Sequence, residues 1–122
     1  MRILIADDQK HTRKGLKAML SASLPGPKIW EAMTGLEAER LAEEIQPDLI
    51  LMDIRMPEGD GLSATRQIKA RHPEIRIVVL SLHTEREQDA LAAGADAFVS
   101  KGESPQRLLQ TITALAIPHE QP

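Results

Sequence analysis

The chain has 122 residues, a formal net charge of -3 and no cysteine. This length suits one domain with a buried core and is too short for two. Acidic and basic residues are interspersed without a basic stripe, so direct nucleic-acid binding by this segment is not expected. Disulfides, thiolate metal sites and a cysteine nucleophile are excluded. The apolar start at 1–6 is too short for a signal peptide or a membrane span, and we expect a cytoplasmic protein with no membrane partner.

Short aliphatic runs alternate along the chain with longer segments whose apolar residues recur at helical spacing. This alternation predicts repeated βα units. The runs at 49–52 and 77–80 are continuously apolar, which is typical of strands covered on both faces. In chain order, strands are expected at 3–6, 29–30, 49–52, 77–80 and 97–99.

Helices are expected between and after these strands. Their apolar faces are clearest at 16–20, 38–45 and 108–115, while the segments at 61–70 and 85–93 are less regular. Local sequence signals mark where the helices begin. These signals are the capping boxes Thr34 with Glu37 and Thr84 with Glu87, the cap Asp60 before Gly61, and Ser104 before Pro105 as a first helical residue.

Together these elements predict an α/β fold, a single doubly wound, flavodoxin-like domain. Its five parallel strands are expected in the order 2-1-3-4-5, with helices on both faces. We expect this domain to span residues 1–117. After position 117 the chain has two prolines and three polar residues, which predicts a tail or the start of a linker at 118–122.

Polar residues follow four of the five expected strands. Asp7 and Asp8 come directly after the first strand, and Asp53 comes directly after the third. Ser81 follows the fourth strand, and Lys101 lies just past the fifth. In a doubly wound sheet, ligands bind beyond the carboxyl ends of the strands, where the strand order reverses. We therefore expect these five side chains to converge on one edge of the sheet.

Three carboxylates at one edge repel each other, and a single lysine compensates them only in part. A bound Mg²⁺ would resolve this conflict, because it prefers hard oxygen ligands and combines carboxylates with phosphate oxygens and water. A calcium loop at 53–61 is disfavoured because apolar residues and a proline interrupt its ligand positions. Asp53 stands alone on the central strand and is the expected nucleophile for a phosphoryl group, whereas the adjacent Asp7 and Asp8 suit the metal.

The chemistry-bearing residues belong to motifs that occur in a fixed order along the whole chain. These motifs are Asp7-Asp8, MDIRMP at 52–57, Asp60-Gly61, Leu80-Ser81 and AFVSK at 97–101. With this ordered set the chain resembles a bacterial two-component response-regulator receiver domain, most like those of the NarL/LuxR-type transcriptional regulators.

The resemblance implies roles for the acidic residues. Asp53 would be the phosphoacceptor, receiving its phosphoryl group from a sensor histidine kinase. Asp8, Asp53 and the backbone carbonyl of Arg55 would bind Mg²⁺ directly, and Asp7 would act through a water molecule. Such a domain is a phosphoacceptor in signalling rather than an enzyme, although it assists its own phosphorylation and dephosphorylation.

The resemblance also implies how the phosphoryl group is sensed. Lys101 would hold one phosphoryl oxygen and Ser81 another, while Phe98 is either a switch residue or a core residue. The surface formed by the fourth helix, fifth strand and last helix would then change. Arg55 and His83 occupy the positions that tune the phosphate lifetime, and we hypothesise that their bulk obstructs the attacking water and prolongs it.

The same resemblance implies a homodimer on phosphorylation and a C-terminal DNA-binding output domain that this chain does not contain. Two other functions stay open. One is a stand-alone receiver or a pseudo-receiver that acts by protein contacts without phosphorylation. The other is a small aspartyl-phosphate phosphatase, which the chain supports poorly because residue 55 is Arg rather than an acid and no cap insertion exists.

Overall fold

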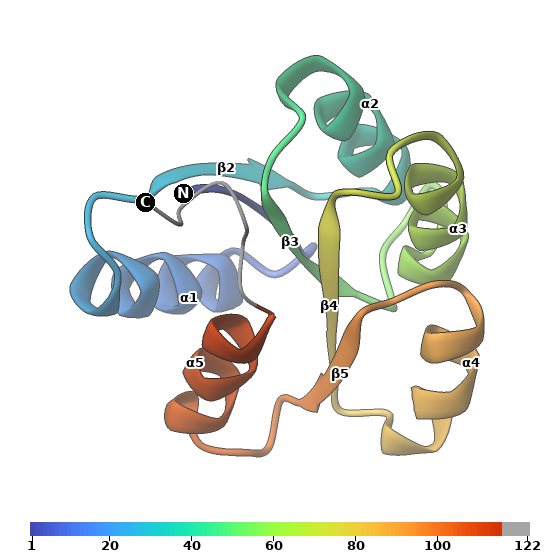
Figure 1. Cartoon of the computed structure of the whole chain (residues 1–122). Coiled ribbons are helices and arrows are strands. Elements are labelled where there is room, and N and C mark those ends of the chain that lie inside the picture. The colour runs from blue at the N-terminus through green and yellow to red at the C-terminus, as the bar shows by residue number, and fades with distance from the viewer. Residues whose placement is uncertain (116–122) are drawn as a thin grey trace.

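The structure is a computed structural model, and it describes residues 1–115. The expected end of the domain at residue 117 and the expected tail at 118–122 therefore lie outside the described residues. Figure 1 shows a central sheet with helices on its two sides. Among the described residues, no helix has both the length and the apolar character needed to cross a membrane.

The sheet has five parallel strands in the order β2-β1-β3-β4-β5, which confirms the predicted fold and strand order. The strands are β1 (Arg2–Ala6), β2 (Lys28–Ala32), β3 (Leu49–Asp53), β4 (Arg76–Ser81) and β5 (Ala97–Ser100). In register, Ala6 pairs with Met52, and Asp53 pairs with Leu80. The carboxyl ends of β1, β3 and β4 are therefore aligned at one edge.

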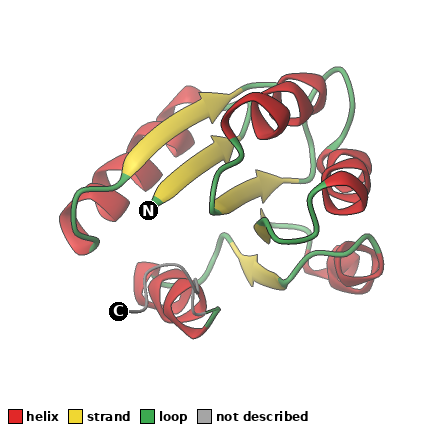
Figure 2. Ribbon diagram, turned by 45° about the horizontal axis from the view of Figure 1, so that its top comes forward, coloured by secondary structure: helices red, strands yellow, loops and turns green. Residues whose placement is uncertain are grey.

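Helices cover both faces of the sheet, as Figures 1 and 2 show. Helices α1 (Lys10–Ser23) and α5 (Pro105–Ala114) lie on one side. Helices α2 (Gly35–Ile45), α3 (Gly61–Arg71) and α4 (Glu87–Ala92) lie on the other. Each face therefore needs its own apolar side chains.

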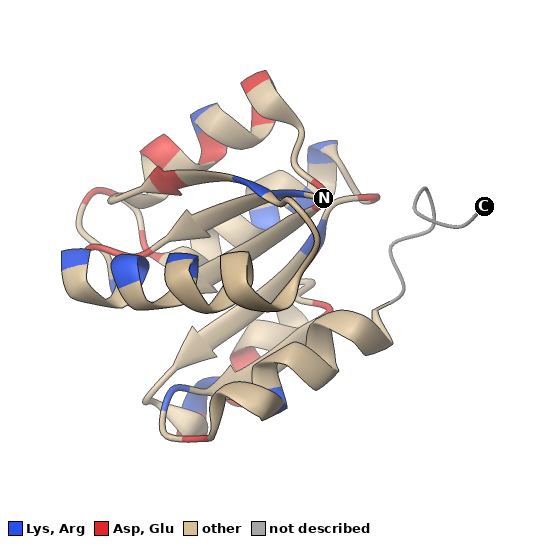
Figure 3. Cartoon of the chain, turned by 90° about the vertical axis from the view of Figure 1, so that its left-hand side faces the viewer, with Lys and Arg blue, Asp and Glu red and all other residues tan. Residues whose placement is uncertain are grey.

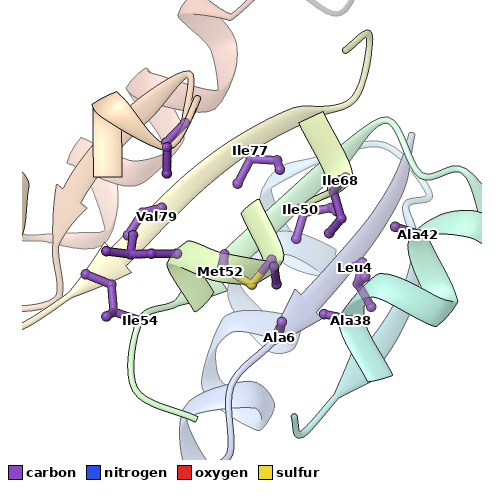
Figure 4. Packing of buried hydrophobic residues seen from close by; sticks show 14 of the residues in the cluster. Leu4, Ala6, Ala38, Ala42, Ile50, Met52, Ile54, Ile68, Ile77 and Val79 are labelled. Carbon is purple, nitrogen blue, oxygen red and sulfur yellow. The ribbon is translucent and has the colours of Figure 1, made fainter. Parts of the chain in front are cut away.

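Alternate residues of each strand supply these two cores, because successive side chains of a strand point to opposite faces. On β1, Ile3 and Ile5 pack with the α1 and α5 side, while Leu4 packs with the α2 to α4 side. Figure 4 shows the second of these clusters, in which Leu4 lies near Ala38 and Ala42 of α2. The same two-sided burial explains why β3 and β4 are continuous apolar runs in the sequence.

The predicted helix starts are mostly confirmed. Thr34 accepts a hydrogen bond from the Glu37 backbone N–H at 3.0 Å, although the Glu37 carboxylate accepts from the Met33 N–H at 2.8 Å rather than from Thr34. Asp60 caps α3 through the Ser63 N–H at 2.8 Å, and α5 begins at Pro105.

The predicted capping box of Thr84 with Glu87 is wrong. Residues Thr84–Arg86 form a 3₁₀ turn, η1, and α4 begins only at Glu87. The Glu87 N–H donates to the backbone carbonyl of Thr84, so the tighter turn satisfies this donor without the threonine hydroxyl. The sequence pattern alone does not distinguish the two arrangements.

Candidate functional site

Four strands deliver polar residues to the carboxyl edge of the sheet. Asp53 is the last residue of β3 and Ser81 is the last residue of β4, while Asp7 directly follows β1 and Lys101 directly follows β5. The Lys101 N–H donates to the Ser81 carbonyl at 3.0 Å, which continues the pairing of β5 with β4. The edge lies where the strand order reverses, between β1 and β3.

The three carboxylates form a compact cluster. Asp7, Asp8 and Asp53 each offer an oxygen, and these oxygens all lie within 4.8 Å of one another. The Asp7 and Asp53 residues are 2% and 8% exposed, whereas Asp8 is exposed. The cluster is therefore buried on one side and reaches solvent through Asp8.

Lys101 connects two members of the cluster. Its Nζ donates to Asp7 Oδ2 at 2.8 Å and lies 3.4 Å from Asp53 Oδ1. The expectation that Lys101 lies at this edge agrees with the structure, but its shorter contact is to Asp7. The other Asp7 oxygen, Oδ1, accepts from the Gln9 backbone N–H at 2.9 Å. Both Asp7 oxygens therefore have protein partners.

Electrostatics make a cation favourable here. Burial raises the pKa of Asp53, and the negative charge of Asp7 raises it further, while Lys101 opposes both effects only in part. Burial would lower the pKa of Lys101, but its hydrogen bond to Asp7 and the charges of both carboxylates raise it. One ammonium among three carboxylates leaves an excess of negative charge, so these hard oxygen donors fit a divalent cation such as Mg²⁺.

The sequence predicts that Ser81 senses a phosphoryl group and that Phe98 is either a switch residue or a core residue. Ser81 is 1% exposed, and its Oγ accepts from the His83 N–H at 2.9 Å, which leaves the hydroxyl proton available to another acceptor. Phe98 is partly buried and packs against the cluster under α2 to α4. In this conformation Phe98 is a packing residue.

Arg55 and His83 stand on the loops that follow β3 and β4. Arg55 is exposed and lies two residues after Asp53. His83 is half-buried, and its Nδ1 lies 3.4 Å from a Glu85 oxygen. Both residues are therefore close in sequence to the site.

The loop at 54–60, which carries Arg55, is held against the start of α2. The Leu36 N–H donates to the Glu58 carbonyl at 3.0 Å. A Cβ added at Gly35 would overlap the carbonyl group of Gly59. The glycine at 35 thus permits a close backbone approach that no other residue allows without a shift, and the sequence did not single it out.

A role for Arg13 at the site was also not predicted from the sequence, although Arg13 is only 7% exposed in the structure. Its Nη1 donates to the Asp7 carbonyl oxygen at 2.8 Å, and its Nε donates to a Glu31 carboxylate oxygen at 2.9 Å. A signal was present, because Arg13 lies three and seven residues before Leu16 and Leu20, on the apolar face of α1.

Comparison with known proteins agrees with this geometry. The family model described as response regulator receiver domain matches residues 3–113. The transcriptional regulatory protein YhcZ of Bacillus subtilis is 42% identical over 113 residues, which cover 91% of this chain and 53% of that protein. The transcriptional activator protein ExaE of Pseudomonas putida is 37% identical over 127 aligned residues, covering 100% of this chain and 59% of that protein. The chain thus spans little more than half the length of these relatives.

Solved structures agree as well. A two-component response regulator of the LuxR family from Aurantimonas superposes with a TM-score of 0.87 at 33% identity, over 93% of this chain and 83% of that one. A DNA-binding response regulator of the LuxR family from Staphylococcus aureus gives a TM-score of 0.85 at 26% identity, over 93% and 97% of the two chains. The fold, the acidic edge and these relatives lead to one conclusion: the chain belongs to the response regulator receiver domain family, with relatives among the NarL/LuxR-type transcriptional regulators.

Proposed function

We propose that Asp53 accepts a phosphoryl group from a sensor histidine kinase in a Mg²⁺-dependent reaction. The observation that carries this proposal is the cluster of three carboxylates within 4.8 Å, with Lys101 between Asp7 and Asp53. An Asp53 oxygen attacks phosphorus, the bond between phosphorus and the kinase imidazole nitrogen breaks, and that nitrogen leaves with its electron pair and takes up a proton. Positioning and charge stabilisation account for most of such catalysis.

The roles proposed around the metal are those that the family resemblance implies. When bound, Mg²⁺ neutralises charge on the phosphoryl oxygens. Asp8, Asp53 and the Arg55 carbonyl would hold it directly. Asp7 would act through water, which is supported by the engagement of both its oxygens with Lys101 and the Gln9 N–H.

Phosphorylation would then reorganise the surface formed by α4, β5 and α5. A new phosphoryl group offers acceptors to the Lys101 ammonium and the Ser81 hydroxyl. The His83 N–H now donates to Ser81 Oγ. A movement of Ser81 would break this hydrogen bond and so would alter the β4–α4 connection. Phe98 on β5, which packs against the core cluster under α2 to α4, is the candidate switch residue.

The output is proposed to be transcriptional. Two curated relatives are named as a transcriptional regulatory protein and a transcriptional activator, and the match to this chain covers 53% and 59% of their lengths. The parent protein would carry a DNA-binding domain after a receiver domain at 1–117, with 118–122 as tail or linker, and would dimerise on phosphorylation in the cytoplasm. Arg55 and His83 would shield the phosphoryl group from water and prolong its lifetime.

A direct test is incubation of the chain with Mg²⁺ and acetyl phosphate, followed by intact mass spectrometry. We expect a gain of one phosphoryl group that requires Mg²⁺ and is absent from Asp53→Ala. The control Asp89→Ala, which removes an exposed carboxylate of α4, should still gain the group.

The outcome separates the alternatives. No gain, under conditions that phosphorylate another receiver, would favour a pseudo-receiver that acts by protein contacts alone. Turnover of small phosphate esters would favour a phosphatase, which the arginine at 55, in place of an acid, argues against.

A further inference from the structure

Arg13 is a buried cation beside the acidic cluster, and the proposed phosphoryl transfer does not use it. A guanidinium inside a protein is unfavourable unless hydrogen bonds and an opposite charge compensate it. Only 7% of Arg13 is exposed, although it lies on α1, whose other basic residues are largely exposed. Figure 3 shows Lys and Arg, without Asp or Glu, along this helix. Arg13 therefore differs in its surroundings from the other cations of α1.

The partners of Arg13 link α1 to β2 and to the acidic pair. Its Nη1 donates to the Asp7 carbonyl at 2.8 Å, and its Nε donates to Glu31 at 2.9 Å. Lys17, one turn further along α1, lies 3.4 Å from the other Glu31 oxygen. The hydrogen bond from Arg13 is the largest cause of the lowered pKa of Glu31, so this carboxylate stays ionised opposite the guanidinium.

Strand β2 also binds the backbone of Asp7 directly. The Asp7 N–H donates to the carbonyl of Ala32, the residue after Glu31, at 3.0 Å. A closed set of contacts results, in which β2 binds the Asp7 N–H directly and the Asp7 carbonyl through Arg13. Both polar groups of the Asp7 backbone are thereby fixed.

The Asp7 carbonyl matters because it belongs to the peptide bond that joins Asp7 to Asp8. A peptide unit is planar, so a hydrogen bond that fixes its carbonyl also fixes the plane from which the next residue departs. The exposed Asp8 carboxylate has no hydrogen-bond or ion-pair partner in the described part of the chain. Its direction therefore depends on the backbone that carries it.

We propose that Arg13, held by Glu31, is a positioning residue that orients the Asp7–Asp8 peptide and thereby sets the Mg²⁺ affinity of the acidic cluster. This proposal rests on the proposed function. Arg suits the role better than Lys, because its planar fork donates to two acceptors in fixed directions. Outer partners of metal ligands typically change metal affinity by about 10- to 100-fold when they are removed.

The sign of the effect separates positioning from simple electrostatics. Removing a positive charge near three carboxylates should strengthen cation binding if charge alone matters. Loss of orientation should weaken it. The control Lys14→Gln removes the same charge from an exposed position of the same helix and leaves the contacts of Asp7 intact.

The test measures the Mg²⁺ dissociation constant by titration calorimetry for the unmodified chain, Arg13→Met, Arg13→Lys, Glu31→Gln and Lys14→Gln. We expect the Mg²⁺ dissociation constant to rise roughly tenfold or more for Arg13→Met, and to rise by an intermediate factor for Arg13→Lys and Glu31→Gln. Lys14→Gln should bind equally or more tightly. The combination of Arg13→Met with Glu31→Gln should be no worse than Arg13→Met alone, because both act on one contact.

A second readout is the phosphorylation rate as a function of Mg²⁺. The half-saturating Mg²⁺ concentration should rise in the Arg13 variants, while the rate at saturating Mg²⁺ is largely kept. Unchanged or tighter Mg²⁺ binding by folded Arg13 variants would overturn the positioning role. If Arg13→Met does not fold, Glu31→Gln decides, because its side chain lies at the surface and equal Mg²⁺ affinity there would overturn the proposal. If the unmodified chain binds no Mg²⁺ and gains no phosphoryl group, the proposed function itself fails.

Discussion

Two chemically identical substitutions, Gly35→Ala and Gly15→Ala, should change stability in opposite directions. At Gly15 in α1 an added Cβ would have nothing within 4 Å, so the usual advantage of alanine in a helix applies, about 0.5–1 kcal/mol. At Gly35, the first residue of α2, the added Cβ would overlap the Gly59 carbonyl. The backbone of the loop at 54–60 must then move away from α2.

The magnitude for Gly35→Ala follows from two losses. Separation of the loop from α2 breaks the hydrogen bond from Leu36 to Glu58, a net loss of about 1 kcal/mol. The overpacked contact itself costs about 1–3 kcal/mol. The higher helix propensity of alanine offsets about 0.5–1 kcal/mol of these losses, so we expect a net destabilisation of roughly 2 kcal/mol. For a domain of this size that corresponds to a fall in melting temperature of roughly 8 °C.

Urea unfolding of the two variants and the unmodified chain, without Mg²⁺, measures both free energies. Because the loop also carries Arg55, Gly35→Ala should in addition require more Mg²⁺ for half-maximal phosphorylation by acetyl phosphate, whereas Gly15→Ala should not. Equal or higher stability of Gly35→Ala would refute the inference that this close approach holds the loop in place. Loss of stability without any change in Mg²⁺ dependence would limit the contact to a structural role.

Three further predictions concern the cap, the acidic site and the phosphate lifetime. Thr34→Ala should lower the unfolding free energy by about 1 kcal/mol in urea, while Thr84→Ala should be close to neutral, because only the first hydroxyl caps a helix; equal losses would contradict the observed start of α4. Burial, and then the charge of Asp7, raise the pKa of Asp53 in the folded state without Mg²⁺. Between about pH 4, the usual pKa of an aspartate, and this raised pKa, the folded state therefore holds a proton that the unfolded chain has released. The free energy of unfolding should fall as the pH rises through this range. Asp53→Asn should flatten that slope in urea unfolding at a series of pH values, and an unchanged slope would assign the effect to other groups. Arg55→Ala or His83→Ala should speed the loss of phosphate in a mass-spectrometric time course, whereas slower loss would refute the shielding role.

The fold could be predicted from the sequence because its signals are local or repetitive. Two-sided burial of β3 and β4 appears as continuous apolar runs. The helix starts at Thr34, Asp60 and Pro105 are each encoded by three or four neighbouring residues. The failure at Thr84 has the same origin. A threonine three residues before a glutamate fits either a capped α-helix or a 3₁₀ turn, and in the structure residues Thr84–Arg86 form the 3₁₀ turn.

The sequence by itself determined which residues meet at the functional edge. Parallel strands bring their carboxyl ends together, so Asp7, Asp8, Asp53 and Lys101 converge once the strand order is known. Tertiary structure alone decided how they are partnered. Lys101 makes its shorter contact with Asp7, 94 residues away in sequence, rather than with Asp53.

The same limit applies to Arg13 and Gly35. In the sequence Arg13 is one basic residue of a basic helix, and its burial between Asp7 and Glu31 depends on how α1 lies across β1 and β2. Gly35 is one glycine before a helix, and the need for it arises only where α2 meets the loop after β3. Strand order and periodicity are encoded locally, whereas the contacts that aim a site join segments far apart in the chain and depend on distances of a few ångströms.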